Sequence, residues 1–478
     1  MVHRASKENR NKHQALKILL INPPQVTRYP QPPLGLAMLA AVLEKKGYTV
    51  KIKDFTAVGL SENVIPQIIR ADKPDIVGIT AMTSTINSAV RVARKVKESD
   101  SNILVVLGGS HASILPEETL EKNSEIDLIV RGVGEQTILE LAEAIERKAS
   151  DLSSVLGLTY RTKSGVKSNP LRSPLLDLDK LPFPAFHLLP RGKYRLHPPF
   201  GRRSPAMPIM ISRGCPYSCI FCSKSVFGNK YRNNSPIYVV NQIRLLIEKF
   251  GVKEIKFYDD VFTLDRKWVM AICAELKNQG IDVPWTCETR VDLVDVELLR
   301  TMKDAGCYMI AYGVESGDQG ILTAVGKSVT LNQITKAFSL THEAGIGTVG
   351  YFMLGTPNET PETIKRTIEF AKKLNPDFVQ FSIATPYPGT ELNRLAVEKG
   401  CLPESWDEYI YADLKSVDSS FFELTAMSWQ ELRKWNRKAY SSFYLRRGYI
   451  WKRLKKMTTF GELKTNIIGV RMLLDLVK

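Results

Sequence analysis

The sequence predicts an α/β protein with two successive alternating units: a doubly wound parallel sheet followed by a partial (β/α)6 barrel. Three observations support this prediction. From residue 16 to about residue 149, five short apolar runs alternate with segments of helical periodicity, the pattern of a parallel sheet covered by helices. From residue 208 to about residue 400 the same alternation occurs six more times. The 478 residues suffice for two to four domains at about 150 residues each.

The expected strands of the first unit are short, and all but the second are largely apolar, as in sheets buried on both faces. They span residues 16–22, 48–54, 75–80, 103–107 and 128–130, with helices over 34–46, 62–71, 84–98 and 135–147. Ligands of such sheets bind at the carboxyl ends of the strands. The turns at these ends are therefore the candidate binding residues.

The pattern changes after the first unit. Residues 157–161 and 166–169 flank a Lys-Ser-Gly turn and predict a hairpin, and a Pro-rich connector follows. We assign residues 1–150 to the first domain, 151–204 to a linker, 205–400 to the second domain and 401–478 to a helical, basic C-terminal region.

The second domain repeats a strand and a helix six times. Its expected strands are 209–212, 254–258, 285–288, 309–314, 348–354 and 378–383, with helices over 237–250, 267–278, 295–305, 331–344 and 361–374. Six units are too few for an eightfold barrel and predict an open one, with functional groups on the loops after the strands.

Charge and composition narrow the class of protein. The formal net charge is +16, and residues 433–478 hold 13 Lys or Arg against Glu462 and Asp475. Such a tail attracts anions, although a solvated basic face explains it equally well. No uncharged apolar run reaches the roughly 18–20 residues that span a bilayer, and the N-terminus lacks the apolar core of a signal peptide. Seven cysteines in a large chain fit a reducing compartment, so we expect a cytoplasmic protein.

The strongest motif is Cys215-Pro-Tyr-Ser-Cys219-Ile-Phe-Cys222, directly after a predicted strand and a turn. Three thiolates on one tight loop can each hold one iron of a [4Fe–4S] cluster, which leaves the fourth iron open to a small molecule. Zinc is the main alternative, but a structural zinc site normally has four ligands, and no His is near enough in sequence to complete one.

With this loop, the segment from about residue 207 to 392 resembles the radical S-adenosylmethionine (SAM) superfamily. The resemblance implies that Cys215, Cys219 and Cys222 ligate a [4Fe–4S] cluster whose open iron chelates SAM. An electron from the reduced cluster would then cleave SAM to a 5′-deoxyadenosyl radical. Phe221, just before the third cysteine, would border the adenine.

The same resemblance assigns residues at the other strand ends. Asp259, in a Tyr-Asp-Asp run where many members carry a glycine-rich motif, would accept from the SAM ammonium. Glu288 and Arg290 end the third strand, where the family binds the ribose or the carboxylate of SAM. The later strands are followed by Gly313-Val-Glu315-Ser, Gly355-Thr-Pro-Asn-Glu-Thr360 and Pro386-Tyr-Pro388-Gly-Thr390, which place Glu315 and Pro388 among the SAM-binding candidates. A lone Glu at a strand end is more often a helix cap or an ion-pair partner, but the order of all these motifs is specific.

The first unit resembles the cobalamin-binding module that precedes some radical SAM domains. The matching turns are Asn22-Pro-Pro, Pro33-Leu-Gly, Gly108-Gly109-Ser-His111 and Gly132-Val-Gly134-Glu135. Glycines there let the backbone approach a flat macrocycle, and the following helix offers free N–H groups. Ordinary strand-to-helix turns are the alternative explanation.

One departure from that module concerns cobalt. Modules that ligate cobalt from below use Asp-x-His-x-x-Gly, and this sequence has Thr56 at the histidine position, between Asp54 and Gly59. Threonine is a poor cobalt ligand, and His111 is on a different loop. The resemblance therefore implies cobalamin without a histidine ligand, its lower face covered by the domain itself.

Together the resemblances imply a cobalamin-dependent radical SAM enzyme that C-methylates an unactivated carbon of a small molecule. Two alternatives stay open: a cyclase, hydratase or C–C bond-forming enzyme of the same fold, and a non-catalytic iron–sulfur or nucleic-acid-binding protein. Catalytic residues beyond the cofactor sites remain unassigned. We expect an electron donor such as flavodoxin or ferredoxin. The basic aromatic tail (residues 440–460) favours a lipid or acidic substrate and peripheral membrane contact over nucleic acid, although a helix that caps the barrel also explains it.

Overall fold

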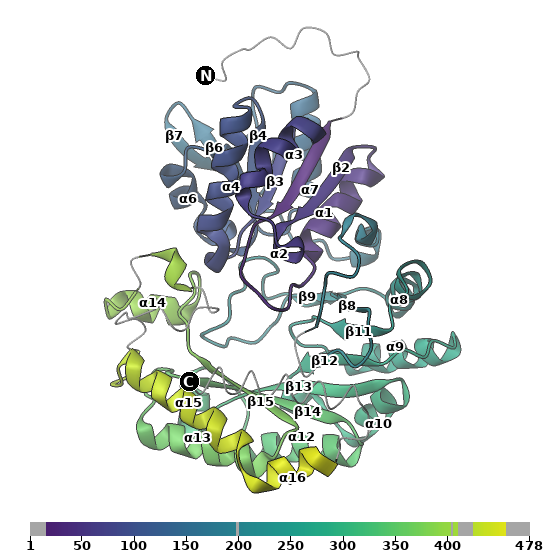
Figure 1. Ribbon diagram of the computed structural model, residues 1–478, viewed down its shortest axis with the longest axis vertical. Helices are drawn as coiled ribbons and strands as arrows, with labels where there is room; N and C mark the ends of the chain where they lie inside the picture. Colours follow the sequence, from purple (N-terminus) through teal and green to yellow (C-terminus); the bar gives the residue numbers. More distant parts are fainter. Residues whose placement is uncertain (1–15, 197–199, 403–404, 410–423, 456–478) are drawn as a thin grey trace. The chain divides into compact units, whose positions relative to one another are not determined.

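A computed structural model of the chain describes residues 16–196, 200–402, 405–409 and 424–455 (Figure 1). The chain forms two compact units. Unit 1 comprises Met1–Tyr194 and two later segments, Lys224–Arg232 and Glu404–Val417, and unit 2 comprises the remaining residues. No sequence pattern predicted that these two segments return to the N-terminal unit.

Unit 1 is built on a sheet that contains seven strands of the described chain, in the order β2-β1-β3-β4-β5-β6-β7. Strands β1 to β5 are parallel, and β6 and β7 extend the sheet in antiparallel fashion. The strands are β1 (Lys17–Asn22), β2 (Thr49–Asp54), β3 (Ile76–Thr80), β4 (Leu104–Gly108), β5 (Leu128–Val130), β6 (Leu158–Thr162) and β7 (Gly165–Ser168). The hairpin expected within the linker is thus part of this sheet.

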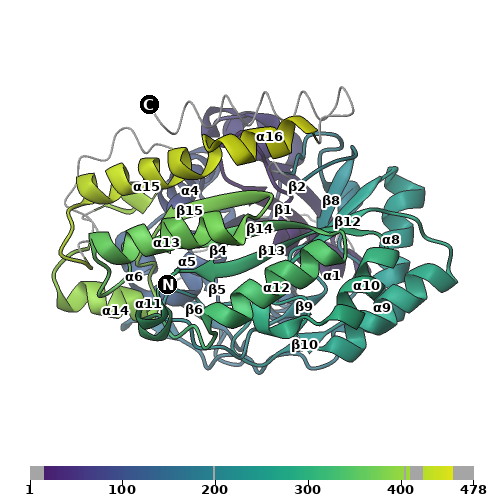
Figure 2. The same ribbon diagram turned by 90° about the horizontal axis from the view of Figure 1, so that it is seen from below.

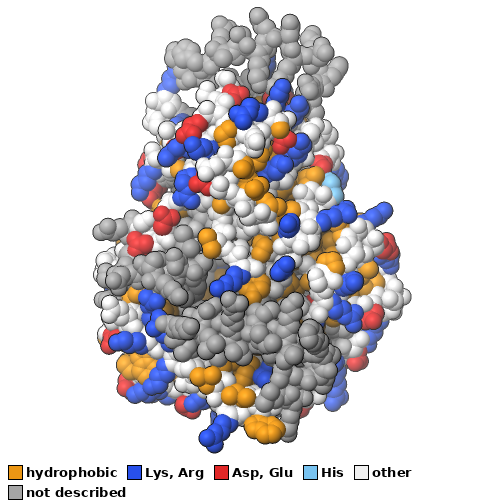
Figure 3. Space-filling view, in the orientation of Figure 1, with side chains coloured by type: hydrophobic (Ala, Val, Ile, Leu, Met, Phe, Trp, Pro, Cys, Tyr) orange, Lys and Arg blue, Asp and Glu red, His pale blue; other side chains and the backbone are white. Residues whose placement is uncertain are grey.

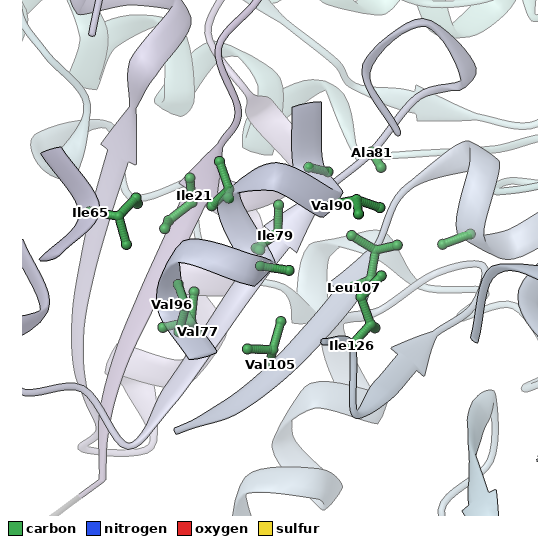
Figure 4. Close-up of a cluster of buried hydrophobic side chains, with 14 of the residues drawn as sticks. Ile21, Ile65, Val77, Ile79, Ala81, Val90, Val96, Val105, Leu107 and Ile126 are labelled. Carbon is green, nitrogen blue, oxygen red and sulfur yellow. The ribbon is translucent and has the colours of Figure 1, made fainter. Parts of the chain in front are cut away.

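Helices cover the sheet and build its core. They are α1 (Leu34–Lys45), α2 (Phe55–Val58), η1 (Glu62–Val64), α3 (Ile65–Asp72), η2 (Thr83–Thr85), α4 (Ile86–Ser99), α5 (Ser110–Ile114), α6 (Pro116–Lys122), α7 (Glu135–Glu146), η3 (Leu178–Lys180), η4 (Phe186–Leu188) and η6 (Trp406–Tyr409). Figure 4 shows Val77 and Val105 of adjacent strands packed with Val96 of α4, all fully buried. Each such side chain contributes about 1.5–3 kcal/mol by leaving water.

Unit 2 contains a parallel sheet that has six strands in the described chain, in the order β15-β14-β13-β12-β11-β8. They are β8 (Ala206–Ile209), β11 (Glu254–Phe257), β12 (Trp285–Thr289), β13 (Cys307–Glu315), β14 (Gly347–Leu354) and β15 (Phe378–Ile383), with short strands β9 (Ser212–Arg213) and β10 (Arg232–Asn233) apart from them. The first strand was predicted over residues 209–212. The observed strand β8 begins and ends three residues earlier. Pro208 lies within β8, which is an edge strand, where proline is tolerated.

The helices of unit 2 follow its strands. They are α8 (Pro236–Phe250), α9 (Arg266–Asn278), η5 (Val291–Leu293), α10 (Val296–Asp304), α11 (Gln319–Ala324), α12 (Leu331–Glu343), α13 (Pro361–Leu374), α14 (Glu391–Glu398), α15 (Trp429–Tyr444) and α16 (Arg447–Lys455). Side-chain oxygens of Ser235, Asp265, Asp295, Thr330 and Thr360 accept first-turn N–H groups. Such caps fix where these helices begin.

Helix α15 protects the open edge of this sheet, along which it runs in Figure 2. The Tyr444 hydroxyl accepts from the Val379 N–H at 2.9 Å and donates to the Val379 carbonyl at 2.8 Å. One helical turn earlier, Tyr440 makes the same pair of bonds with Phe381 at 3.1 and 3.2 Å. Phenol groups thus replace the neighbouring strand that β15 lacks.

Candidate functional site

The cysteine loop follows β8 at the carboxyl edge of the unit 2 sheet and is anchored through its backbone. Ile220 donates its N–H to the Val325 carbonyl at 3.1 Å and accepts the Leu392 N–H at 2.9 Å. A Cβ on Gly326 would lie 2.7 Å from the Ser218 carbonyl, so only glycine allows this approach. The loop is therefore fixed on both sides by neighbouring strand-end segments.

The three thiols differ in exposure. Cys215 and Cys219 are half-buried and Cys222 is exposed. Burial raises the pKa of the Cys219 thiol, and the nearby Lys327 charge acts in the opposite direction. Cys273, Cys287 and Cys307 are buried core residues, as expected for dispersed cysteines.

Within the described ranges, no group of three His, Cys, Asp or Glu side chains is gathered closely enough to hold a metal ion. The Cys219 and Cys222 thiols instead face the carbonyls of Gly326 and Ser223, at 3.9 and 4.0 Å. The donor set still fits an iron–sulfur cluster: three soft thiols lie on one loop held by its backbone, and none is sealed in a core. The thiol side chains must turn from these carbonyls to bind iron.

Glu315 lies at the end of β13, where its backbone adopts φ 66°. Its carboxylate accepts from Lys327 Nζ at 2.9 Å, and both side chains are almost completely buried. A Cβ on Gly313 would lie 2.6 Å from Glu315 Oε1 and 2.7 Å from Lys327 Nζ. Glycine at 313 therefore makes room for the ion pair. Lys327 was not identified as a site residue from the sequence. A lysine shortly after the helix that follows Glu315 has no pattern that marks it as a partner of Glu315.

Arg290 is buried and lies over the cysteine loop. Its guanidinium carbon is 3.6 Å from the centroid of the Tyr217 ring, inside the Cys215–Cys222 loop. The same group donates to both carboxylate oxygens of Asp292, at 3.0 and 3.1 Å. Arg290 thus joins the loop to the end of β12.

Glu288, two residues before Arg290, lies in a polar cluster. Lys256 donates to Glu288 Oε1 at 2.9 Å, and the Tyr351 hydroxyl donates to the same atom at 3.2 Å. Lys256 is 5% exposed and lies over the rings of Phe200 and Tyr258, at 3.7 and 4.6 Å. The Glu288 side chain remains one-third exposed, so one face of the carboxylate stays accessible.

Asp259 supports the chain that leads into the cysteine loop. Its Oδ1 accepts the N–H groups of Ile211 and Ser212 and the Ser212 hydroxyl, at 2.5–3.0 Å. Its Oδ2 is buried and has no hydrogen-bond partner. Burial raises the pKa of Asp259 to about 7.

Two further residues follow the last two strands of unit 2: the buried Glu359 after β14 and Pro388 after β15. Pro388 is buried in the turn before α14, which Thr390 caps. Phe221 packs beside the start of α14, against the cluster that contains Ala384 and Leu392. Glu359, which sequence reasoning left without a role, accepts the Gly355 and Thr356 N–H groups after β14.

In unit 1 the predicted glycine turns lie together at the carboxyl edge of the sheet. Gly109 has φ 99°, and a Cβ there would lie 2.4 Å from the Ala81 carbonyl, so the turns after β3 and β4 touch through their backbones. The Ser113 hydroxyl bridges two turns: it donates to the Gly109 carbonyl and accepts the Gly132 N–H, both at 2.8 Å. Gly108 ends β4. Gly134 precedes α7, whose first residue, Glu135, is buried.

Thr56 and its neighbours have their polar groups engaged within unit 1. The Thr56 hydroxyl donates to the Pro23 carbonyl at 2.7 Å. Asp54 accepts from Asn22 at 2.8 Å, from the Ala57 N–H at 3.1 Å and from the Tyr194 hydroxyl at 2.9 Å. The motif around Thr56 therefore holds the turn after β1 and offers no nitrogen to a metal.

His111 is 2% exposed, and burial lowers its pKa to about 4. By contrast, Val26 and Met82, in the loops after β1 and β3, are 81% and 51% exposed. Exposed apolar side chains beside tight glycine turns fit a large, flat cofactor at this edge. The donor set around that edge fits cobalamin held without a histidine from the Thr56 motif.

This geometry defines a class: a ligand-binding doubly wound domain joined to a partial barrel with a three-cysteine loop. Two family models match the chain, the B12 binding domain over residues 25–142 and the radical SAM superfamily over residues 209–371. The chain is 39% identical to a Pyrococcus horikoshii protein named as an uncharacterized methyltransferase, over 91% of this chain and 93% of that one. It belongs to the radical SAM superfamily, among members with an N-terminal B12-binding domain.

Two further comparisons agree with this assignment. An anaerobic magnesium-protoporphyrin IX monomethyl ester cyclase of Rubrivivax gelatinosus is 36% identical, over 76% of this chain and 65% of that one. The solved structure of the radical SAM methyltransferase TsrM from Kitasatospora setae, with cobalamin and a [4Fe-4S] cluster bound, has a TM-score of 0.67 at 21% identity, over 80% of this chain and 76% of that one. The chain is thus a radical SAM enzyme, and family membership gives its cofactors as a [4Fe–4S] cluster, SAM and cobalamin. This decides against the non-catalytic alternative.

Proposed function

We propose that this enzyme transfers a methyl group to an unactivated carbon of a small molecule. The observation that carries the proposal is the presence, in one chain, of a three-cysteine loop after β8 and of glycine turns after β4 and β5 that are joined to each other and to the turn after β3. The similarity to a protein named as a methyltransferase over nearly its full length also supports it. When bound, the cluster and SAM supply the 5′-deoxyadenosyl radical, and cobalamin supplies the methyl group.

In this proposal the residues at the barrel edge bind and orient SAM. Cys215, Cys219 and Cys222 ligate the cluster. The buried Lys327 and Arg290 provide positive charge beside the loop, suited to an anionic carboxylate, and Glu315 holds Lys327 in place. A buried, charge-assisted hydrogen bond of this kind contributes about 1.5–3 kcal/mol.

The remaining assignments follow from position. Phe221 and Pro388, both beside α14, form an apolar wall for the adenine. The accessible face of Glu288 accepts a hydroxyl of the ribose. Asp259 orients the segment before the cluster loop, and its unpartnered Oδ2 is the atom available to an ammonium.

In unit 1, Gly108, Gly109 and Gly134 let the backbone approach the cofactor. Thr56, His111 and Glu135 line the same carboxyl edge and place polar groups near it. Because the Thr56 hydroxyl is already bonded to Pro23, its role is to shape the turn after β1 rather than to ligate cobalt.

Products of SAM test the proposal. Anaerobically reconstituted enzyme, given a reductant, methyl-labelled SAM and a metabolite extract, should form 5′-deoxyadenosine together with S-adenosylhomocysteine and a labelled product. The relative named as a cyclase makes cyclisation the second candidate. It predicts 5′-deoxyadenosine without S-adenosylhomocysteine.

A finer proposal concerns partners. Leu445, Ile450 and Trp451 are 58%, 43% and 65% exposed, and residues 432–455 contain nine Lys or Arg and no acidic residue. Figure 3 shows basic and hydrophobic side chains intermingled at the lower end of unit 2, where α16 lies in Figure 1. We propose that this surface contacts an anionic membrane. Such a contact suits a lipid or acidic substrate. We also propose that a flavodoxin or ferredoxin delivers the electron that reduces the cluster.

Sedimentation with vesicles tests the membrane contact. The protein should bind vesicles that contain phosphatidylserine and not pure phosphatidylcholine vesicles, and Trp451→Ala should weaken binding. Equal binding to both vesicle types would contradict the proposal. Among the described residues, the helices include none that is long and apolar enough to cross a membrane.

A further inference from the structure

Trp406 reaches unit 1 from the second half of the chain. It lies in η6, within the segment Glu404–Val417 that belongs to unit 1 although the residues on either side belong to unit 2. Its side chain packs against the hydrophobic core of unit 1, and η6 contacts η2 and α4. The segment thus adds an aromatic side chain to the N-terminal sheet.

The Trp406 side chain lies at the carboxyl edge of the unit 1 sheet. Element η2 follows β3, and α5 follows β4, and these two strands are adjacent and parallel. Ligands of such sheets bind at this edge. Trp406 therefore stands at the edge to which we assign cobalamin.

At that edge Trp406 contacts His111, the histidine of the predicted cobalamin turns. The ring centroids are 4.9 Å apart, with the planes at 80°, an edge-to-face contact. On its other side, His111 Nδ1 lies 3.3 Å from the Thr83 hydroxyl. Two elements far apart in sequence therefore fix the imidazole.

The charge state of His111 would not by itself prevent it from binding a metal. Burial lowers its pKa to about 4, so the imidazole is neutral at pH 7, the form that binds metals. To reach a cofactor at the edge, the ring would have to leave both Thr83 and Trp406.

We propose that Trp406 is a positioning residue of the cobalamin site, which holds His111 against Thr83 and thereby keeps the imidazole off cobalt. The inference rests on the proposed cobalamin function and extends it. It assigns control of the lower ligand of cobalt to a segment that follows the radical SAM domain. Removal of the indole should release His111.

Electron paramagnetic resonance of the Co(II) form of the full-length, cobalamin-loaded enzyme tests this. The wild-type spectrum should lack superhyperfine splitting from an axial nitrogen. Trp406→Ala should show that splitting, and the double variant Trp406→Ala/His111→Ala should lose it again. Trp406→Phe keeps an aromatic ring and should resemble the wild type. A Trp406→Ala spectrum identical to the wild type, or wild-type splitting that disappears in His111→Ala, would overturn the proposal.

A second measurement needs no cofactor. In the cobalamin-free protein, NMR titration should place the His111 pKa near 4 in the wild type and closer to its ordinary value in Trp406→Ala, because loss of the indole exposes the ring to water. An unchanged pKa would show that Trp406 does not restrain the ring. If the wild type binds no cobalamin, the proposed function fails, while this titration still decides whether the restraint exists.

Discussion

Lys327 Nζ lies 2.9 Å from Glu315 Oε1, in an ion pair that is almost completely buried at the end of β13. Removing one partner leaves the other charge buried and unpaired, which costs about 3–5 kcal/mol. The pair therefore stabilises this strand end only as a unit, and it lies beside the cysteine loop, where we propose that SAM binds.

Lys327→Met should lower the free energy of unfolding by about 3 kcal/mol and weaken SAM binding to the reconstituted enzyme. Urea titration and calorimetry measure the two effects. Lys122→Met, which breaks an exposed pair with Glu118, is the control and should change stability by less than about 1 kcal/mol. Unchanged SAM affinity in Lys327→Met would remove the lysine from the site.

Cluster ligation can be tested by iron content. The triple variant Cys215→Ala, Cys219→Ala, Cys222→Ala should hold no [4Fe–4S] cluster after anaerobic reconstitution, because no thiolate remains on the loop. Cys273→Ala, which alters a fully buried cysteine of α9, should keep the full iron and sulfide content. Iron and sulfide retained by the triple variant would show that the ligands lie elsewhere.

Gly109→Ala should disrupt the carboxyl edge of unit 1. The new Cβ would lie 2.4 Å from the Ala81 carbonyl at a φ of 99°, so the turns after β3 and β4 would have to separate. Cobalamin uptake should fall sharply, measured by absorbance after gel filtration. Gly47→Ala, with φ 90° and open space around its Cβ position, isolates the backbone strain and should leave uptake intact. Equal loss in both variants would point to strain alone.

The edge of β15 offers a test of stability. Tyr444→Phe removes a hydroxyl that bonds both polar groups of Val379. Leaving buried backbone groups unsatisfied costs about 1–3 kcal/mol, so the urea midpoint should fall while the fold is kept. A midpoint equal to that of the wild type would mean that water replaces the phenol.

Stability should depend on pH through Asp259. Burial raises its pKa to about 7 in the folded protein, against about 3.9 in an unfolded chain. Between these values the folded state holds a proton that the unfolded chain has lost, so stability falls as pH rises from about 4 to about 7. Asp259→Asn keeps an acceptor for Ile211 and Ser212 and should reduce this slope in urea titrations of the cofactor-free protein. If stability depends on pH with the same slope in Asp259→Asn and in the wild type, the raised pKa of Asp259 is contradicted.

The order of strands and helices was predictable because strands β1 to β5 and the six-stranded sheet of unit 2 are parallel, so short strands alternate with helices along the chain. Phe378–Ile383 and Pro361–Leu374 have their predicted bounds, since proline, a threonine cap and polar flanks mark them. What each site side chain contacts was not predictable. Lys327 pairs with Glu315, and Trp406 with His111, through folding of distant segments, and no local pattern encodes such pairs.

The fate of the methyl group of SAM tests the proposed methyl transfer most directly. Reconstituted enzyme, incubated anaerobically with a reductant, methyl-labelled SAM and a metabolite extract, should yield 5′-deoxyadenosine and S-adenosylhomocysteine in comparable amounts, with the label on a carbon of one product. Cobalamin-free enzyme should yield 5′-deoxyadenosine without a labelled product. Formation of 5′-deoxyadenosine by the fully loaded enzyme with no S-adenosylhomocysteine and no labelled product would contradict the assignment as a methyltransferase.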